Sequence, residues 1–163
     1  MDVFTVAEVA MLLRDVDGRH AFTPRAIRYY ARAGVLEPSG RVAGDRGARL
    51  YTLEDVAMLR LLWMLQRKWH LSERVVWALF VYRHAEFRAQ LASRAGVIEI
   101  LESAAVSRGA EDARTIQWPV RVPVSFVFER LQTKASALRR RRPKVWTGLG
   151  WTSPIEAAAM VSA

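Results

Sequence analysis

Residues 23–36 read Thr-Pro-Arg-Ala-Ile-Arg-Tyr-Tyr-Ala-Arg-Ala-Gly-Val-Leu and carry the clearest signals in the chain for a short, well-bounded helix. Thr23 is of a residue type that caps helix N-termini, and Pro24 suits the first helical position, where a missing N–H costs nothing. Gly34 supplies a C-terminal stop. This punctuation predicts a helix within residues 23–36.

The two faces of this helix differ in chemistry. With 3.6 residues per turn, one face collects Arg25, Arg28, Tyr29 and Arg32. The opposite face carries the residues expected in the core, which are Ala26, Ile27, Tyr30, Ala31 and Gly34. Because solvated helix faces usually mix charges and this helix has no acid, the cationic face indicates a polyanionic partner. Ordinary surface arginines are the alternative.

The rest of the composition narrows the class of protein. The chain has 163 residues, 52% of them hydrophobic, which suits one compact domain plus an appendage. It has no cysteine, and His20, His70 and His84 are scattered, so we expect no disulfide, no metal site and no other cofactor. No apolar run approaches the roughly 18 residues that span a bilayer, and we expect a cytoplasmic protein with no membrane partner. No nucleophile elbow or phosphate-binding loop is present, which argues against an enzyme.

The net charge of +9 is unevenly distributed. Residues 19–51 hold seven arginines against two acids, and residues 116–163 hold eight Lys or Arg against two acids. Residues 71–115 are neutral. Two basic regions therefore flank a neutral middle, and we expect nucleic acid at the first of them.

Capping motifs place the neighbouring elements. Thr5-Val-Ala-Glu8 is a capping box that opens a helix of about ten residues, and Asp15-Val-Asp-Gly18 is a turn. Residues 37–51, rich in Gly and Arg, predict a basic hairpin, and Thr52-Leu-Glu-Asp55 opens the next helix. Ser72 begins another helix. Helix, turn, helix and basic hairpin together describe a winged helix-turn-helix.

The middle of the chain suggests a dimer contact. Apolar residues from 87 to 105 alternate spacings of four and three, as in a coiled-coil seam, with Arg94 and Gly96 as interruptions. The predicted dimerisation residues are Phe87, Leu91, Ile98, Leu101 and Ala105. Packing of these residues within the monomer is the alternative.

The C-terminal third changes period. Apolar residues occupy the even positions Trp118, Val120, Val122, Val124, Phe126 and Phe128. Pro119 and Pro123 permit only an edge strand there, so we expect an extended ribbon that gives way to a helix near residue 124. That helix ends in a cluster that offers a second basic contact, formed by Lys134, Arg139, Arg140, Arg141, Arg142 and Lys144. Trp146 and Trp151 follow in a predicted loop or tail.

Two of these motifs resemble a known family. Ala26-Ile-Arg-Tyr-Tyr30 and Gly34-Val-Leu36 resemble the recognition helix of the MerR family of bacterial transcription regulators, which has a Thr-Ile/Leu-Arg-Tyr-Tyr core followed by Gly-Leu-Leu. Gly47-Ala-Arg-Leu-Tyr51, followed by Thr52-Leu-Glu-Asp55, is similar to the wing of that family, Gly-Tyr-Arg-x-Tyr, and its next helix start. The resemblance covers about residues 3–80, reaches weakly to a dimer helix near 87–107 and leaves the C-terminal third unmatched.

The resemblance implies a function and a set of contacts. Family members bind inverted repeats in promoter DNA as dimers and distort the duplex so that RNA polymerase can engage. It implies DNA contacts from Arg25, Arg28, Tyr29 and Tyr30 in the helix and from Arg49 and Tyr51 in the wing, to which their neighbours add Thr23, Arg32 and Arg46. For Tyr30, a purely structural role is the alternative. Ala31, Ala48 and the long loop at 14–22 depart from the family pattern and leave the choice of bases open.

The sequence therefore predicts a mainly α-helical protein. We expect a winged helix-turn-helix DNA-binding domain at 1–70, a helical linker and dimerisation region at 71–110, and a basic, aromatic C-terminal region at 111–163. The leading hypothesis is a homodimeric DNA-binding transcription regulator. The alternatives are an architectural, recombination or phage accessory DNA-binding protein, and a regulator whose C-terminal region binds an apolar small molecule or RNA polymerase. In the latter two roles the aromatic ribbon would be a binding surface, whereas packing on the protein's own core is the competing interpretation.

Overall fold

The computed structural model describes residues 3–18, 22–38, 40–41, 49–107, 113–142, 145–146 and 151–152; at 41, 101–107, 113–118, 145–146 and 151–152 it describes the backbone alone. The elements in chain order are β1 (Val3–Thr5), α1 (Val6–Asp17), α2 (Pro24–Arg32), β2 (Gly40–Arg41), β3 (Arg49–Thr52), α3 (Leu53–Arg67), α4 (Glu73–Tyr82), α5 (His84–Ser93), β4 (Val97–Ser107), β5 (Ala113–Pro123), α6 (Val124–Phe128), α7 (Leu131–Arg141), β6 (Val145–Trp146) and β7 (Trp151–Thr152). The chain is mainly helical and begins with a winged helix-turn-helix, as predicted.

The predicted capping motifs start the helices. In α1 the backbone N–H of Thr5 donates to Glu8 Oε2 at 2.9 Å, and the Thr5 side chain caps the helix in return. In α3 the backbone N–H of Thr52 donates to Asp55 Oδ2 at 2.8 Å. Ser72 caps α4. These local hydrogen bonds satisfy N–H groups that have no partner within the helix, which explains why the helices begin at these residues.

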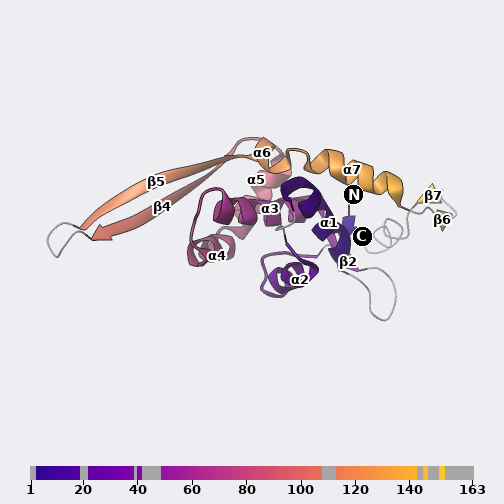
Figure 1. Cartoon of the computed structure of the whole chain (residues 1–163), viewed down its shortest axis with the longest axis horizontal. Coiled ribbons are helices and arrows are strands. Elements are labelled where there is room, and N and C mark those ends of the chain that lie inside the picture. The colour runs from indigo at the N-terminus through magenta and orange to yellow at the C-terminus, as the bar shows by residue number, and fades with distance from the viewer. Residues whose placement is uncertain are drawn as a thin grey trace.

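Helix α3 is the centre of the fold. Its buried residues lie on every side of the helix, and they include Val56, Ala57, Met58, Leu59, Leu61, Leu62, Met64 and Leu65. A helix that is apolar all round must be enclosed by other elements. Helices α1, α4, α5, α6 and α7 pack against it (Figure 1).

A small antiparallel sheet with the order β1-β3-β2 carries the wing. Val3 pairs with Thr52, and Gly40 pairs with Leu50, so the first residues of the chain hold the base of the wing. The wing loop between β2 and β3 lies outside the described residues. No helix among the described residues is long and apolar enough to cross a membrane.

A buried arginine joins the N-terminal and C-terminal parts of the chain. The side chains of Arg60 in α3 and Asp17 in α1 are each only 5% exposed, and Arg60 Nε lies 3.0 Å from Asp17 Oδ2. Arg60 Nη1 donates to the carbonyl oxygens of Val127 at 2.6 Å and Glu129 at 2.7 Å. The guanidinium thus bridges α1 to the end of α6 through α3.

A second arginine makes a similar link at the other end of α1. Arg142, just after α7, is buried; its Nε donates to Glu8 Oε1 at 2.8 Å and its Nη2 to the carbonyl oxygen of Val3 at 2.6 Å. Its guanidinium also lies over the ring of Phe4. The prediction that Arg142 offers a basic contact to a partner is therefore wrong, because this side chain is used inside the protein.

The predicted helix over 87–107 is interrupted. Helix α5 ends at Ser93, where Arg94 takes a left-handed conformation (φ 58°), and Gly96 has φ 87°, which favours glycine. Strand β4 then begins at Val97. The apolar residues from 87 to 105 have the spacing of a helix. The chain nevertheless reverses at Gly96, and the residues after it form a strand.

The predicted dimerisation residues are divided between two elements. Phe87, Leu91 and Ile98 have no exposed surface and belong to the core of the monomer, which was the alternative interpretation of the pattern. Leu101 and Ala105 lie in β4, where the structure describes the backbone alone. A helical seam between two copies is therefore not available from these residues.

The extended ribbon and its crossover to helix are confirmed. Strand β5 ends at Pro123 and α6 begins at Val124, and β4 and β5 form a long hairpin that projects from the body (Figure 1). At its base, Val120, Val122, Val124 and Phe128 are buried in the protein's own core, whereas Phe126 is partly exposed. The side chains of Trp118, Trp146 and Trp151 lie outside the described residues, although the backbones of β6 and β7 pair where a loop was expected.

The Arg60 link predicts a large stability effect. Arg60→Ala leaves the Asp17 carboxylate and several carbonyl oxygens buried without a donor, so we expect it to lower the free energy of unfolding by about 3–5 kcal/mol in urea melts. Arg67→Ala, an exposed arginine on the same helix, is the control and should cost less than about 0.5 kcal/mol. Equal costs for the two variants would contradict the role assigned to Arg60.

Candidate nucleic-acid interface

Helix α2 has well-defined ends. Thr23 Oγ1 accepts the backbone N–H of Ala26 at 3.2 Å, and Pro24 takes the first turn. At the other end Gly34 adopts φ 78° and the N–H of Val35 donates to the carbonyl oxygen of Tyr30 at 3.0 Å. This left-handed glycine closes the helix and sends the chain back into the core.

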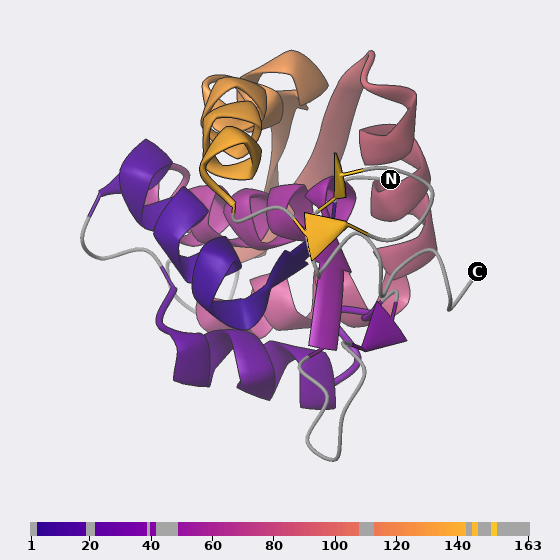
Figure 2. The same ribbon diagram turned by 90° about the vertical axis from the view of Figure 1, so that its right-hand side faces the viewer.

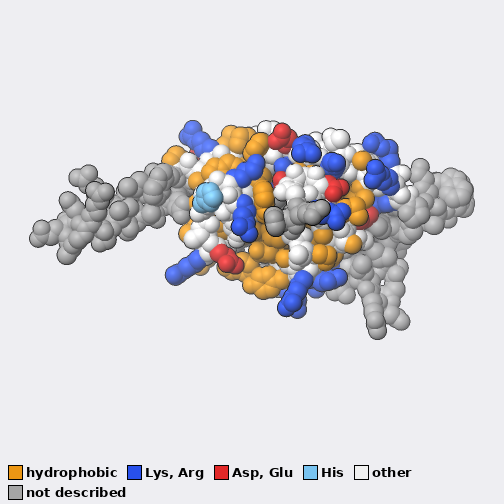
Figure 3. Space-filling view, in the orientation of Figure 1, with side chains coloured by type: hydrophobic (Ala, Val, Ile, Leu, Met, Phe, Trp, Pro, Cys, Tyr) orange, Lys and Arg blue, Asp and Glu red, His pale blue; other side chains and the backbone are white. Residues whose placement is uncertain are grey.

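The cationic face of α2 is exposed, as the helical period predicted. Arg25, Arg28, Arg32 and Thr23 are exposed, and Tyr29 is 54% exposed. Ile27 on the opposite face has no exposed surface and anchors the helix. Figure 3 shows Lys and Arg side chains at the lower edge of the molecule, where Figure 1 places α2. The helix therefore presents arginines and a tyrosine to solvent from a fixed position.

Tyr30 belongs to an aromatic cluster that ties α2 to α4. Its ring packs edge-on against Phe22 and Tyr29, with centroids 5.3 and 5.6 Å apart, and lies 6.0 Å from the ring of Trp77. Burial, with a smaller effect from the charge of Glu73, raises the pKa of Tyr30. Its half-buried ring thus has a structural role, and this role is compatible with a hydroxyl that reaches solvent.

The base of the wing lies beside α2. A hollow between them is lined by Ala31, Pro38, Gly40 and Arg49. Arg49 is partly exposed, whereas Tyr51 is completely buried, so the structure does not offer Tyr51 as a surface contact. Burial raises the pKa of Tyr51, and the charges of Arg49 and Arg28 act in the opposite direction. Tyr51 therefore supports the wing next to these two cations. Arg46 lies outside the described residues.

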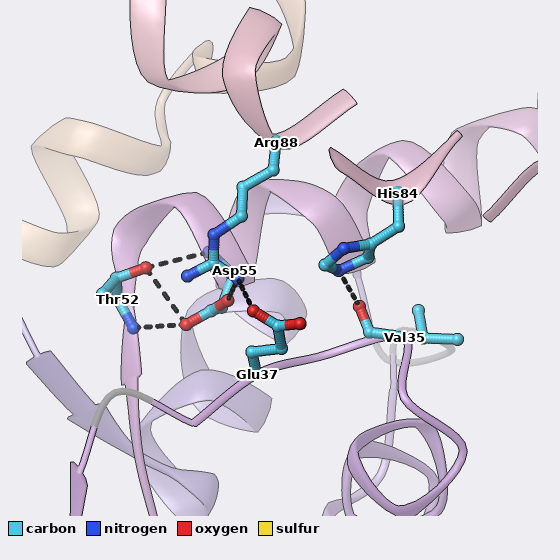
Figure 4. A network of polar contacts seen from close by, with 6 residues as sticks. All are labelled: Val35, Glu37, Thr52, Asp55, His84 and Arg88. Atoms are coloured by element: carbon cyan, nitrogen blue, oxygen red, sulfur yellow. Dashed lines mark hydrogen bonds and ion pairs between the residues drawn. The ribbon is translucent and has the colours of Figure 1, made fainter. Parts of the chain in front are cut away.

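Helix α5 holds the connector between α2 and the wing through a polar network (Figure 4). His84 forms a hydrogen bond to the carbonyl oxygen of Val35 at 3.0 Å. Arg88 Nη1 donates to Asp55 Oδ1 at 3.0 Å and lies 3.8 Å from Glu37. The connector therefore has one polar link to His84 and a second, longer one to Arg88.

Asp55 is the buried member of this network. Its side chain is 1% exposed, and this burial raises its pKa, although hydrogen bonds from Thr52 and the charge of Arg88 oppose the shift. The carboxylate caps α3 and binds Arg88 at once. Local spacing revealed the capping box but not Arg88, which is 33 residues away in the sequence.

The basic cluster of α7 lies far from α2. Figures 1 and 2 place α7 and α2 on opposite sides of the body, with α1 and α3 between them. Arg139, Arg140 and Arg141 are exposed and Lys134 is partly exposed. Lys144 lies outside the described residues. The described cations of α2 and α7 thus lie on separate surfaces.

The described residues contain no group of three or more His, Cys, Asp or Glu side chains that could hold a metal ion. What the α2 surface offers is chemistry for a polyanion. Guanidinium groups bind phosphates and guanine edges, and tyrosine hydroxyls donate to phosphate oxygens.

Comparison with known families agrees with this geometry. Residues 4–68 match the family model described as MerR HTH family regulatory protein, and the chain beyond residue 68 is outside that match. The matched segment includes α1, α2, the wing strands and α3. A search of curated proteins finds no match. The family match confirms the resemblance seen in the sequence and supports a DNA-binding transcription regulator, a class distinct from enzymes.

The α5 network predicts a pH-dependent loss of stability. Arg88→Ala removes a charge that lowers the pKa of buried Asp55, and we expect a loss of about 2 kcal/mol at pH 7, discounted because Arg88 is partly exposed. A carboxyl whose pKa is raised in the folded state destabilises the fold as pH rises from the ordinary Asp value through the raised one. The deficit of the variant in urea melts should therefore shrink as pH falls toward 4.

Glu37→Gln is the matched control for this network. Glu37 is 69% exposed and more distant from Arg88, so its replacement should change stability by less than about 0.5 kcal/mol at either pH. A deficit of Arg88→Ala that stays constant between pH 7 and pH 4 would show that the charge of Asp55 is not its cause.

Proposed function

We propose that this chain, whose residues 4–68 form a MerR-type helix-turn-helix domain, is a homodimeric transcription regulator that reads inverted-repeat promoter DNA. The observation that carries the proposal is the exposed face of α2, where Arg25, Arg28, Tyr29 and Arg32 project from a helix anchored in the core by Ile27. We place its action in the bacterial cytoplasm, at the nucleoid.

The two parts of the interface have different tasks in this proposal. Helix α2 enters the major groove, where an arginine can read guanine through two hydrogen bonds. The wing, with Arg49 at its base and Arg46 in its loop, binds phosphates and sets register. Thr23 and Tyr30 contribute at the N-terminus and on the inner side of α2, and Tyr51 supports the wing from inside the fold.

Distortion of the duplex is the mechanistic core of the proposal. Two copies that grip both halves of an inverted repeat can bend and untwist the spacer, at a deformation cost of several kcal/mol that two-sided contacts offset. RNA polymerase then engages a promoter whose elements have been brought into register. The support of α2 by α4 and of the connector by α5 favours this action, because a loosely held α2 would transmit little strain to the duplex.

The buried base of the ribbon bears on the competing proposal of an apolar ligand site. Val120, Val122 and Val124 fill the core of the protein itself, so they are not available to a small molecule. In this proposal the basic surface of α7 does not contact the duplex that α2 reads, because α7 and α2 lie on opposite sides of the body (Figure 2).

Selection of bound sequences from random DNA with the purified protein tests the proposal directly. We expect an inverted repeat whose half-sites are spaced to suit two copies on one duplex. Recovery of no common sequence, with equal binding to all DNA, would instead favour an architectural role.

Two arginine variants separate base reading from phosphate binding. Arg28→Ala should weaken binding to the selected site about 10- to 100-fold and relax preference at one base pair. Arg49→Ala should weaken binding to all sequences alike and reduce the salt slope of binding by about one. Titrations of labelled DNA at fixed and varied salt measure both effects.

Arg140→Ala is the control for charge alone, because it removes an exposed arginine from α7 on the far side of the body. It should leave affinity and salt slope unchanged. Unchanged binding in both Arg28→Ala and Arg49→Ala would contradict the proposed interface, and a loss in Arg140→Ala equal to that in Arg49→Ala would place DNA on α7 as well.

A further inference from the structure

The hairpin of β4 and β5 extends beyond the body of the protein that supports its base. Its strands pair from Val97 with Pro123 at the body to Ser107 with Ala113 at the far end. At its base, residues such as Ile98 and Val122 pack in the core, and the rest of the hairpin backbone projects from the body (Figure 1). An isolated two-stranded hairpin is only marginally stable in water, so pairing with a further strand would stabilise the outer half of this hairpin.

Two prolines reveal the hydrogen-bond pattern of the hairpin. Pro119 lies opposite Leu101, and Pro123 lies opposite Val97. Because proline has no N–H, these pairs must be the ones whose backbone groups point away from the partner strand. Since the pattern repeats every two residues, all the odd-numbered residues of both strands direct their N–H and C=O groups outward.

Two hydrogen bonds agree with this assignment. Arg83 Nη1 donates to the carbonyl oxygen of Glu99 at 2.9 Å from outside the hairpin, so that odd-numbered group points outward. The N–H of Val124 donates to the carbonyl oxygen of Gly96 at 3.0 Å, which continues the even-numbered bonds within the hairpin.

The two edges of the hairpin are therefore unequal. On β5, Pro119 and Pro123 remove outward donors, a device that protects sheet edges from pairing. On β4, next to the body, the outward carbonyl oxygen of Glu99 already accepts a hydrogen bond from Arg83. Beyond it, residues 101–107 contain no proline, and no strand in the described part of the chain pairs with this edge.

We propose that two copies of this chain join through the outer edges of their β4 strands, in antiparallel register over residues 101–107. The result is a four-stranded sheet with the order β5-β4-β4-β5. This inference rests on the proposed function, which requires a dimer. It assigns the dimer contact to a pair of strands in place of the predicted helical seam.

A symmetry argument and two observations favour a second copy as the occupant. A strand that pairs antiparallel with its own copy forms the self-complementary contact of a two-fold dimer, and both copies present the same open donors and acceptors. Residues 103–107 carry no charge, and Ser103, Ala104, Ala105 and Ser107 are small. Glu102 is the one charged residue of the stretch 101–107, and in an antiparallel register centred on Ala104 it lies opposite position 106 of the other copy rather than opposite its own counterpart. Phe87, Leu91 and Ile98 are buried in the core of the monomer, so the helical seam predicted from these residues is not free to serve the dimer.

A pair of proline variants tests the edge. Ala105 and Thr115 face each other across the hairpin, and both direct their N–H groups outward. Ala105→Pro removes a donor from the open edge of β4, whereas Thr115→Pro removes the equivalent donor from the edge of β5 that the prolines already interrupt. Both changes spare the bonds between β4 and β5, as Pro119 and Pro123 do.

Sedimentation velocity over a concentration series gives the readout. We expect a wild-type dimer, an Ala105→Pro protein whose dimer dissociation constant is about a hundred-fold higher, and a Thr115→Pro protein that dimerises like the wild type. Circular dichroism and thermal melts check that both variants fold, and Ser103→Pro provides a second substitution on the open edge. A monomeric wild type, a fully dimeric Ala105→Pro protein, or equal loss in both variants would each overturn the proposal.

DNA binding separates failure of this inference from failure of the proposed function. A single half-site requires only one copy, so wild type and Ala105→Pro should bind it with equal affinity. The intact inverted repeat should be bound more weakly by Ala105→Pro alone. Binding to neither DNA by any variant would refute the DNA-binding function, and the sedimentation results would still decide the strand pairing.

Discussion

The Arg60 guanidinium is a buried positive charge, and the arrangement of the fold around it follows from the need to satisfy it. Its partners come from α1, as the carboxylate of Asp17, and from the α6 end, as the carbonyl oxygens of Val127 and Glu129. A buried charge is tolerated only where charge and hydrogen bonds are both matched. Helix α3 supplies the arginine, so three distant segments must meet at one place.

Buried and half-buried contacts of the same kind extend outward to the proposed DNA-binding surface. Arg142 fixes the start of α1 through Glu8, which leaves α1 held at both ends. Helices α4 and α5 then hold α2 and its connector through the Tyr30 cluster and the His84 contact. The exposed arginines of α2 can thus belong to a rigid body even though their own helix has only nine residues.

Local signals predicted much of this structure, and distant pairs account for the rest. Caps such as Thr5 and Thr23 act within one turn, so spacing alone located α1 and α2. The helical seam predicted from residue 87 is wrong, because apolar spacings of three and four do not reveal that the chain reverses at Gly96. That reversal depends on the backbone conformation of Gly96. The sequence places Arg142 in a basic cluster that offers a contact to a partner, because its actual partner Glu8 lies 134 positions away, where no local pattern reaches.

The Arg60 link also bears on how modular this protein is. The segment that matches the family contains Arg60 and Asp17, but the carbonyl oxygens that complete the site belong to residues 126–129, outside the match. A fragment that ends at residue 68 would therefore leave the Arg60 guanidinium without these carbonyl oxygens. We therefore expect the N-terminal domain and the C-terminal helices to unfold as one cooperative unit, with the C-terminal part a structural requirement of that domain rather than an exchangeable module.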